Sequence, residues 1–335
     1  MNYKVLGKTG LSVSEVGIGG IPIQRADVDT AKALLLQAAE RGVNFIDTAR
    51  AYSVSEEYLG QALAGIRDKF ILATKSGAKT RADMERDIQI SLRNLQTDHI
   101  DLYQLHNPNE AGLEQILAPG GALEALLEAK EEGLIGHIGI TLHSRELFVK
   151  ALELDWVETI MFPYNIVETQ AEALIAKCSE KNIGFICMKP LAGGALPDAK
   201  LAMRFLSANS YIGVVIPGMA SVEELEQNLL SYSDKSPLSG EEWNAIAAVR
   251  KELGTNFCRR CNYCAPCTAG ISIYSIFLME GYFTRYHLED WARGRYEALG
   301  KTAIDCIGCG VCETRCPYDL PIRDMMKHAI QVFGK

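Results

Sequence analysis

The chain has 335 residues, of which 48% are hydrophobic and 23% are charged, as in an ordinary folded protein. This composition excludes a disordered, collagen-like or coiled-coil chain, and no apolar run approaches the roughly 20 residues of a membrane helix. The formal charge of −8 argues against a nucleic-acid partner, because phosphate binding needs a concentrated basic surface. The first residues lack the apolar segment of a signal peptide, so we expect a cytoplasmic protein without a membrane partner.

Charge and cysteine are distributed unevenly along the chain. Residues 1–254 carry a net charge of −10, whereas residues 255–335 carry +2. Eight of the ten cysteines lie in the second segment. We therefore predict a large domain over residues 1–235, a bridging helix over 236–254 and a small cysteine-rich domain over 255–335.

The large domain alternates short apolar runs with amphipathic stretches. Eight runs are predicted strands, at 16–21, 44–48, 70–75, 100–106, 137–141, 159–164, 184–189 and 213–217, with helices such as 30–41, 81–95 and 123–132 between them. This alternation predicts an α/β fold of the (β/α)8 TIM-barrel type. A doubly wound open sheet is the rival, but it usually has fewer units, and this chain lacks the GxGxxG turn after its first strand. Residues 5–14 are expected to form a hairpin at the bottom of the barrel.

Polar side chains follow the second, third and fourth predicted strands. Asp47 and Tyr52 follow the second strand, Lys75 ends the third and His106 ends the fourth. The carboxyl ends of barrel strands meet at one mouth, where the chemistry of such barrels takes place. A buried Lys needs a partner, and Asp47 is available. A cation near Tyr52 would lower the pKa of its phenol and make it a proton donor near neutral pH.

The order Asp47, Tyr52, Lys75, His106 resembles the catalytic tetrad of the aldo-keto reductases. The segments 6–11, 42–49 and 216–218 also resemble this family, over about residues 1–232. The resemblance implies that Tyr52 donates a proton to a small carbonyl substrate, Lys75 lowers the pKa of Tyr52 and Asp47 holds Lys75. His106 would orient the carbonyl, and a nicotinamide dinucleotide would deliver the hydride. The alternative is a structural Asp47–Lys75 ion pair beside an ordinary loop tyrosine.

The same resemblance implies a set of cofactor-binding residues at the later strand ends. They are Thr141, His143, Asn165, Pro190, Leu191, Gly193, Gly218, Ser221, Gln227 and Asn228. Ser221 is a predicted N-cap of the helix beside the cofactor. Relatives that prefer NADPH hold its 2′-phosphate with cations, where this chain aligns Gly218 and Glu224. Because Glu224 would repel that phosphate, the sequence favours NAD(H) over NADP(H), and bound flavin stays open.

Two cysteine motifs define the small domain. The first is Cys258-x2-Cys261-x2-Cys264-x2-Cys267, and the second is Cys306-x2-Cys309-x2-Cys312-x3-Cys316 followed by Pro317. The second matches the bacterial ferredoxin run, so we predict two [4Fe–4S] clusters. Three closely spaced cysteines can hold one cluster while the remote fourth closes the other. By this rule, one cluster is held by Cys258, Cys261, Cys264 and Cys316. The other is held by Cys306, Cys309, Cys312 and Cys267.

Other interpretations of the cysteines remain open. Disulfides are unusual in a cytoplasmic chain, and zinc prefers separated cysteine pairs over runs of four. A single cluster is a further alternative. The insert 271–300 has helical spacing, so we expect a small, mostly α-helical 4Fe-4S ferredoxin-like domain. The whole chain then resembles the iron–sulfur branch of the aldo-keto reductases.

Three functions fit these features. The first is an NAD(P)-dependent oxidoreductase that couples hydride and proton transfer at the tetrad to electron transfer through two clusters, together with a redox partner protein. The second is a carbonyl reductase whose clusters are structural. The third is a non-catalytic electron-transfer or redox-sensing subunit. Substrate, direction of electron flow and oligomeric state lie outside the sequence pattern.

Overall fold

The computed structural model describes residues 1–196, 198–253, 257–260, 263–316 and 318–334. These residues divide into two compact units. The first comprises Met1–Asn165, Thr169–Pro190 and Ala199–Pro237, and the second comprises Ile166–Glu168, Leu191–Asp198 and Leu238–Lys335. Two short loops of the predicted large domain thus belong to the second unit. The predicted boundaries at 235 and 254 lie near Pro237 and near the end of the helix α10 (Gly240–Leu253), which clusters with the second unit.

The first unit is built around eight parallel strands. They are β3 (Ile18–Gly19), β4 (Phe45–Asp47), β5 (Ile71–Ser76), β6 (Ile100–His106), β7 (Ile135–Thr141), β8 (Thr159–Pro163), β9 (Gly184–Met188) and β10 (Val214–Ile216). Each pairs with the next in chain order. Parallel bridges from Val16 to Val215 and from Gly19 to Gly218 join the first and last strands. The result is a nearly closed TIM-like barrel, which confirms the predicted fold class.

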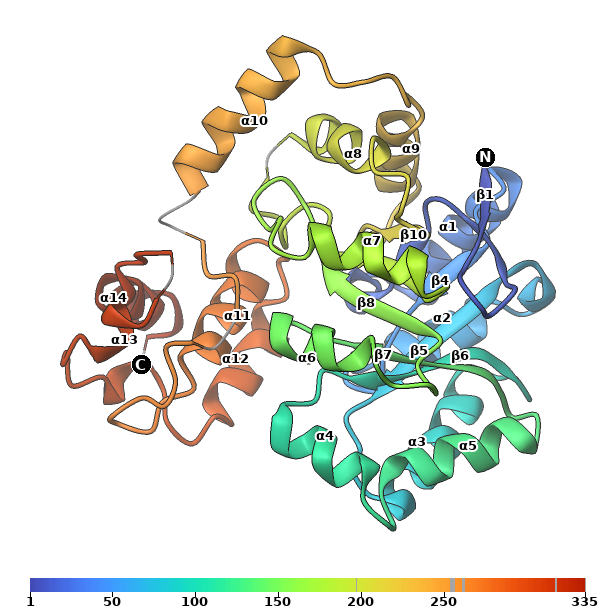
Figure 1. The fold of residues 1–335 in the computed structure, drawn as a ribbon, viewed down its shortest axis with the longest axis horizontal. Helices are drawn as coiled ribbons and strands as arrows, with labels where there is room; N and C mark the ends of the chain where they lie inside the picture. Colours follow the sequence, from blue (N-terminus) through green and yellow to red (C-terminus); the bar gives the residue numbers. More distant parts are fainter. Residues whose placement is uncertain (197, 254–256, 261–262, 317, 335) are drawn as a thin grey trace. The chain divides into compact units, whose positions relative to one another are not determined.

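Helices cover the outside of this barrel (Figure 1). They are α1 (Val28–Glu40), α2 (Ser55–Ala62), α3 (Arg81–Asn94), α4 (Glu110–Leu117), α5 (Ala122–Glu131), α6 (Arg145–Ala151), α7 (Glu172–Glu180), α8 (Ala199–Ser207) and α9 (Val222–Tyr232). Side-chain caps explain where several begin. Asp27, Thr80, Asn109, Ser144 and Ser221 each accept a hydrogen bond from a backbone N–H in the first turn of α1, α3, α4, α6 and α9, as short polar side chains do.

An N-terminal hairpin closes one end of the barrel. Strands β1 (Tyr3–Val5) and β2 (Ser12–Ser14) pair antiparallel. Leu6 and Val13 are fully buried in one cluster with inward side chains of the barrel strands, among them Phe45 and Leu102. Most of the barrel interior is therefore apolar, and polar side chains are concentrated where the strands end.

The regular secondary structure in the described residues of the second unit is helical. Its helices are α10, α11 (Ile273–Thr284), α12 (Glu289–Glu297), α13 (Val311–Thr314) and α14 (Ile322–Phe333). A small core holds α11, α12 and α14 together, and the rings of Tyr296 and Phe333 stack at 3.9 Å between centroids. Six cysteines of the two motifs pack against this core. The predicted helical insert 271–300 is confirmed, since α11 and α12 fill most of it.

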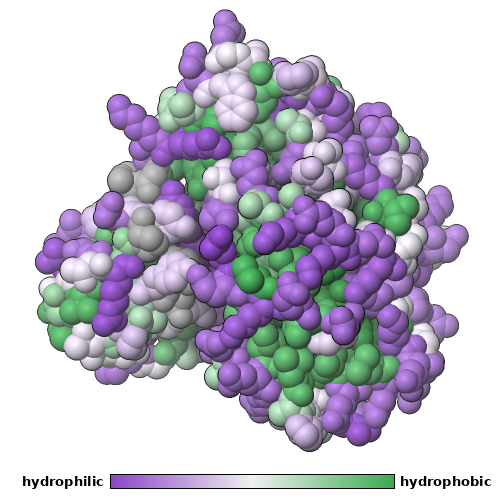
Figure 2. Space-filling model, viewed as in Figure 1, coloured by the Kyte–Doolittle hydropathy of each residue, from purple (hydrophilic) through white to green (hydrophobic). Residues whose placement is uncertain are grey.

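The surface in Figure 2 is mainly hydrophilic, with smaller hydrophobic patches between charged side chains. No helix in the described part of the chain combines the length and apolarity needed to cross a membrane.

Candidate active site

Strand register brings the predicted tetrad to one end of the barrel. Asp47 ends β4, Lys75 lies one residue before the end of β5, and His106 ends β6. These strands are neighbours, and Lys75 pairs in register with Gln104. Tyr52 lies in the loop between β4 and α2. Parallel strands place their carboxyl ends at one edge. Residues as far apart in the sequence as Asp47 and His106, 59 positions, therefore come together there.

Asp47 and Lys75 form a buried ion pair. The Nζ atom of Lys75 lies 2.5 Å from Oδ2 of Asp47 and 2.7 Å from the Thr48 carbonyl oxygen. The two charged side chains are 4% and 3% exposed. Burial raises the pKa of the Asp47 carboxyl and lowers that of the Lys75 ammonium, while their mutual attraction opposes both shifts. The pair therefore places a fixed, desolvated cation at this edge of the barrel.

Tyr52 and His106 are half-buried and lie beside one another at this end of the barrel. Lys75 Nζ is 4.9 Å from the centroid of the Tyr52 ring. The rings of Tyr52 and His106 meet edge to face, with centroids 6.0 Å apart and planes at 88°. A phenol and an imidazole thus face one another beside a buried cation, with part of each ring open to solvent.

The sequence pattern did not reveal three residues that support this arrangement, namely Gln104, Glu56 and Arg50. Gln104 is fully buried and donates from Nε2 to Oδ1 of Asp47 at 2.9 Å. Glu56, 1% exposed, accepts hydrogen bonds from Thr74, Ser91 and Arg50. A signal existed for Gln104, because it lies two positions before His106 on the same strand and so faces the same side. Glu56 and Arg50 lie outside any strand, and no comparable pattern marks them.

The predicted cofactor residues are spread over the ends of β7 to β10 and the helix α9. In the first unit, Thr141 is buried and its hydroxyl accepts from the Asn107 N–H at 3.0 Å. Asn165 is fully buried and donates from Nδ2 to the Lys189 carbonyl at 2.9 Å, which ties the end of β8 to the end of β9. The others described there are His143, Pro190, Gly218, Ser221, Gln227 and Asn228; Leu191 and Gly193 belong to the second unit. Ser221 is the N-cap of α9, as predicted.

Glu224, which was expected to repel a 2′-phosphate, is held by two neighbours. It forms an ion pair with Arg25 and accepts a hydrogen bond from the Ala220 N–H at 2.6 Å. Arg25 ends the 3-10 helix Ile21–Arg25, so a cation lies beside the carboxylate that the sequence alone presents as a lone negative charge. The pattern gave no sign of this partner, which is 199 residues distant.

The described cysteines of the second unit fall into two groups. Cys258, Cys264 and Cys316 line one pocket, with Arg259, Tyr274 and Tyr318. Cys267, Cys306, Cys309 and Cys312 line another. We refer to them as the first and second cysteine groups. Cys261, also predicted as a ligand, lies outside the described residues, as does Pro317.

These groups fit iron–sulfur clusters in their chemistry. The two groups together hold seven described cysteines, and cysteine thiolates are the ligands of such clusters. The described residues hold no set of three His, Cys, Asp or Glu side chains close enough for a single metal ion, whereas a cubane spreads its ligands more widely. Arg260, two residues after Cys258 in the sequence, has a buried Nε that donates to no acceptor among the described residues. Such a donor suits a cluster sulfur.

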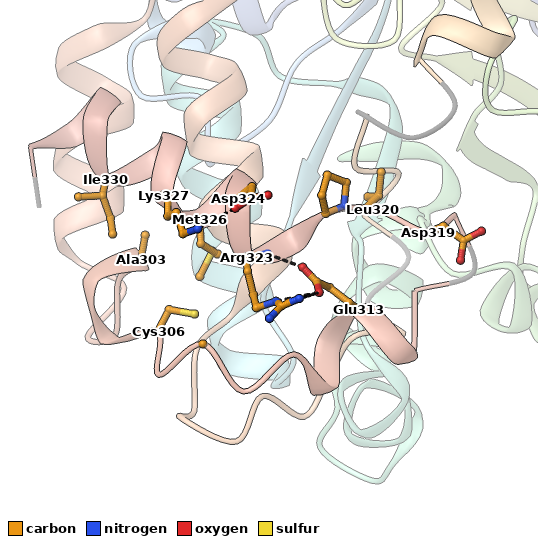
Figure 3. Close-up of a pocket in the computed structure, with 12 residues that line it drawn as sticks. Ala303, Cys306, Glu313, Asp319, Leu320, Arg323, Asp324, Met326, Lys327 and Ile330 are labelled. Carbon is orange, nitrogen blue, oxygen red and sulfur yellow. Dashed lines mark hydrogen bonds and ion pairs between the residues drawn. The ribbon is translucent and has the colours of Figure 1, made fainter.

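The second group lies next to an open pocket of about 710 Å³. Cys306 and Ala303 line one side, and Arg323, paired with Glu313, lies on another (Figure 3). Cys309 is exposed, and Ile304 and Ile307 are 65% and 68% exposed. The second cysteine group is therefore reached from solvent.

Comparisons with known proteins agree with this architecture. Residues 15–202 match the aldo/keto reductase family, and residues 257–321 match a 4Fe-4S dicluster domain. L-galactose dehydrogenase of Arabidopsis thaliana is 28% identical, covering 72% of this chain and 91% of its own. Pyridoxine 4-dehydrogenase of Escherichia coli is 25% identical, covering 74% and 95%. An aldo-keto reductase from Bacillus halodurans in its holo form superposes with a TM-score of 0.64 and 27% identity, over 74% of this chain and 96% of that one.

The fold and these matches define an oxidoreductase. The chain belongs to the aldo/keto reductase family and carries a C-terminal 4Fe-4S dicluster domain. The family acts on small carbonyl substrates with NAD(P)H, and the dicluster domain implies 4Fe-4S clusters.

Proposed function

We propose that this protein is an NAD(P)-dependent oxidoreductase acting on a carbonyl/alcohol pair, with Tyr52, Lys75, Asp47 and His106 as its catalytic groups. The observation that carries the proposal is the buried Lys75–Asp47 pair, with Lys75 Nζ 4.9 Å from the Tyr52 ring centroid. A structural ion pair would not need a half-exposed phenol and imidazole at the same end of the barrel. Such groups at a barrel mouth are suited to proton transfer.

Each residue has a defined part in carbonyl reduction. His106 donates a hydrogen bond to the carbonyl oxygen and orients it. Tyr52 transfers its phenolic proton to that oxygen, and the positive charge of Lys75 stabilises the phenolate that remains. Asp47, itself held by Gln104, fixes the Lys75 side chain. The nicotinamide, when bound, supplies the hydride to the carbonyl carbon.

Thr141, His143 and Asn165 would hold the nicotinamide end of the cofactor. Pro190, Leu191 and Gly193 would follow along the dinucleotide, and Gly218, Ser221, Gln227 and Asn228 would take its adenosine end. The helix α9 begins at this end with Ser221 as its N-cap, and the N-terminus of a helix favours a phosphate. The Arg25–Glu224 pair lies at this end and would decide between NAD(H), which we favour, and NADP(H).

Electron transfer through two [4Fe–4S] clusters is the second part of the proposal. Cys258, Cys261, Cys264 and Cys316 would hold one cluster, and Cys267, Cys306, Cys309 and Cys312 the other, as the two lined pockets support. Nicotinamide transfers two electrons at once and a cluster transfers one. A redox partner protein exchanging single electrons at the exposed Cys309 side would meet this need, and a bound flavin would be another route.

A second candidate function is a carbonyl reductase whose clusters are structural. It is favoured by the arginines of α10 and of the cysteine-rich region that hydrogen-bond to loop residues 166–168. A cluster that orders its own segment would order those loops as well. This function requires cofactor turnover without any change in cluster oxidation.

An anaerobic reduction experiment separates the two candidates. NADH or NADPH is added to the purified protein without substrate, and the visible absorbance of the clusters is followed. Bleaching supports coupled electron transfer. If neither nucleotide bleaches clusters that dithionite reduces, coupling is excluded for nicotinamide alone. Turnover of carbonyl substrates by such a protein would then establish the second candidate.

A further inference from the structure

Two loops that follow barrel strands are held by arginines from the C-terminal part of the chain. Residues 166–168 come directly after Asn165 and β8, and residues 191–198 follow Pro190 and β9. Both loops are part of the second unit. They therefore connect the strand ends where we place the nicotinamide to the unit that holds the cysteines.

Each residue of the first loop accepts a hydrogen bond from a different arginine. Arg250 Nε donates to the Ile166 carbonyl at 2.7 Å, and Arg259 Nε donates to the Val167 carbonyl at 3.3 Å. Arg260 Nη2 lies 3.0 and 3.3 Å from the two carboxylate oxygens of Glu168. In the second loop, the Gly193 carbonyl accepts from Arg285 Nε at 3.1 Å.

Arg260 differs from the other three in its partner, which is a carboxylate instead of a backbone carbonyl, and in its remaining donor. Its side chain is 6% exposed, and that of Glu168 is fully buried. Its backbone adopts a left-handed conformation with φ of 59°, which costs energy for any residue but glycine and persists where surrounding contacts impose it. Its Nε is buried and has no acceptor among the described residues. It lies next in sequence to Cys261 and two residues after Cys258.

We propose that Arg260 is a positioning residue that links the oxidation state of the cluster held by the first cysteine group to dinucleotide binding. This inference rests on the proposed function. Arg260 would share its positive charge between Glu168, to which Nη2 donates, and that cluster, for which Nε would remain available because it has no acceptor among the described residues. Reduction adds a negative charge to the cluster. This charge attracts the Arg260 guanidinium and weakens its ion pair with Glu168.

The consequence follows from the position of Glu168. A weaker hold on Glu168 loosens the loop that begins one residue after Asn165, so the reduced protein binds the dinucleotide less tightly. Coupling between two sites is reciprocal. Bound dinucleotide must therefore lower the midpoint potential of the same cluster by the equivalent amount.

The test uses a redox-inert probe, the 1,4,5,6-tetrahydro forms of NADH and NADPH. Anaerobic calorimetry gives the Kd for oxidised and for dithionite-reduced holoprotein. We expect Kd to be about tenfold higher in the reduced state, a typical size for such coupling. An EPR-monitored potential titration with saturating probe should then show one of the two clusters shifted by about −59 mV, the equivalent of a tenfold change for one electron.

Variants separate the role of Arg260 from general destabilisation. Arg260→Gln should bind the probe equally in both states and lose the potential shift, while Arg260→Lys, which keeps the charge, should restore both. Glu168→Gln leaves the arginine in place and should also abolish the dependence, which keeps the test valid if Arg260→Gln loses iron. Arg293→Gln is the control. Like Arg260, which lies over the Phe257 ring, Arg293 lies over an aromatic ring, that of Phe283, but it donates to the Phe333 carbonyl instead of to a carboxylate.

The outcomes are distinct. Equal affinity of the wild-type protein in both redox states overturns the inference but leaves the proposed function intact. A dependence that persists in both Arg260→Gln and Glu168→Gln also overturns it. If the oxidised wild-type protein binds neither probe, the proposed dinucleotide function itself fails and the inference falls with it.

Discussion

The Nζ atom of Lys75 lies 2.5 Å from Oδ2 of Asp47, with both side chains almost completely removed from solvent. Breaking a buried pair on one side typically costs about 3–5 kcal/mol, because the other charge stays buried. Lys75→Met should therefore destabilise the barrel by that amount. Adding Asp47→Asn should recover most of the loss. Denaturant unfolding of both variants checks this, and equal stability of the single and double variants would contradict it.

Tyr52→Phe should reduce carbonyl turnover by at least about 100-fold, because the variant has no phenolic proton to donate. Nucleotide affinity and cluster spectra should stay unchanged, since the phenyl ring keeps the contact with His106. Steady-state kinetics with a panel of aldehydes and ketones measures the loss. Full physiological activity in this variant would show that the tetrad does not carry the function.

Glu224→Gln should shift cofactor preference toward NADP(H). The change frees Arg25 from its ion pair and removes a negative charge near the expected 2′-phosphate. We expect the ratio of NADPH to NADH affinity to rise about tenfold, equivalent to roughly 1.4 kcal/mol. Arg25→Gln is the opposite control and should lower the ratio. An unchanged ratio in both variants would place the 2′-position elsewhere.

Single cysteine variants distinguish two modes of cluster ligation. In crossed ligation each cluster takes its fourth cysteine from the other motif, whereas in sequential ligation each motif holds its own cluster. With crossed ligation, Cys267→Ala should remove the same EPR signal as Cys306→Ala, and Cys316→Ala the same signal as Cys258→Ala. With sequential ligation, Cys267→Ala would instead match Cys258→Ala. Cys178→Ala, a buried cysteine of α7, should retain both clusters and serves as the control.

Glu158 should make barrel stability depend on acid pH. Burial raises the pKa of its carboxyl, but hydrogen bonds from His137 and Lys130 outweigh this and bring the pKa to about 2, from 4.5. A lowered pKa gives stability that is complete above about 4.5 and is lost as the pH falls toward 2. Glu158→Gln should flatten the profile of unfolding free energy in that window. Glu153→Gln, at an exposed pair with Lys181, should leave the slope unchanged.

Several features of the site could be predicted because they depend on local pattern. The positions of Asp47, Lys75 and His106 at or next to strand ends followed from apolar runs that stop at polar residues. The N-cap at Ser221 followed from its place before a helix. Gln104 was missed although alternation on β6 places it on the face of His106. Arg25, the partner of Glu224, lies 199 residues away and has no local signal.

The sequence by itself determined the repeat of strands and helices, the positions of the four residues of the proposed tetrad and the cysteine motifs, because periodicity and spacing are properties of short segments. Tertiary structure alone decided which acceptors the charged side chains meet. Arg260 and Glu168 are 92 residues apart, and Arg285 and Gly193 are also 92 apart. Contacts of this kind depend on how the chain folds back on itself. A single sequence carries no periodic signal for that, so these contacts within the second unit emerged only from the folded chain.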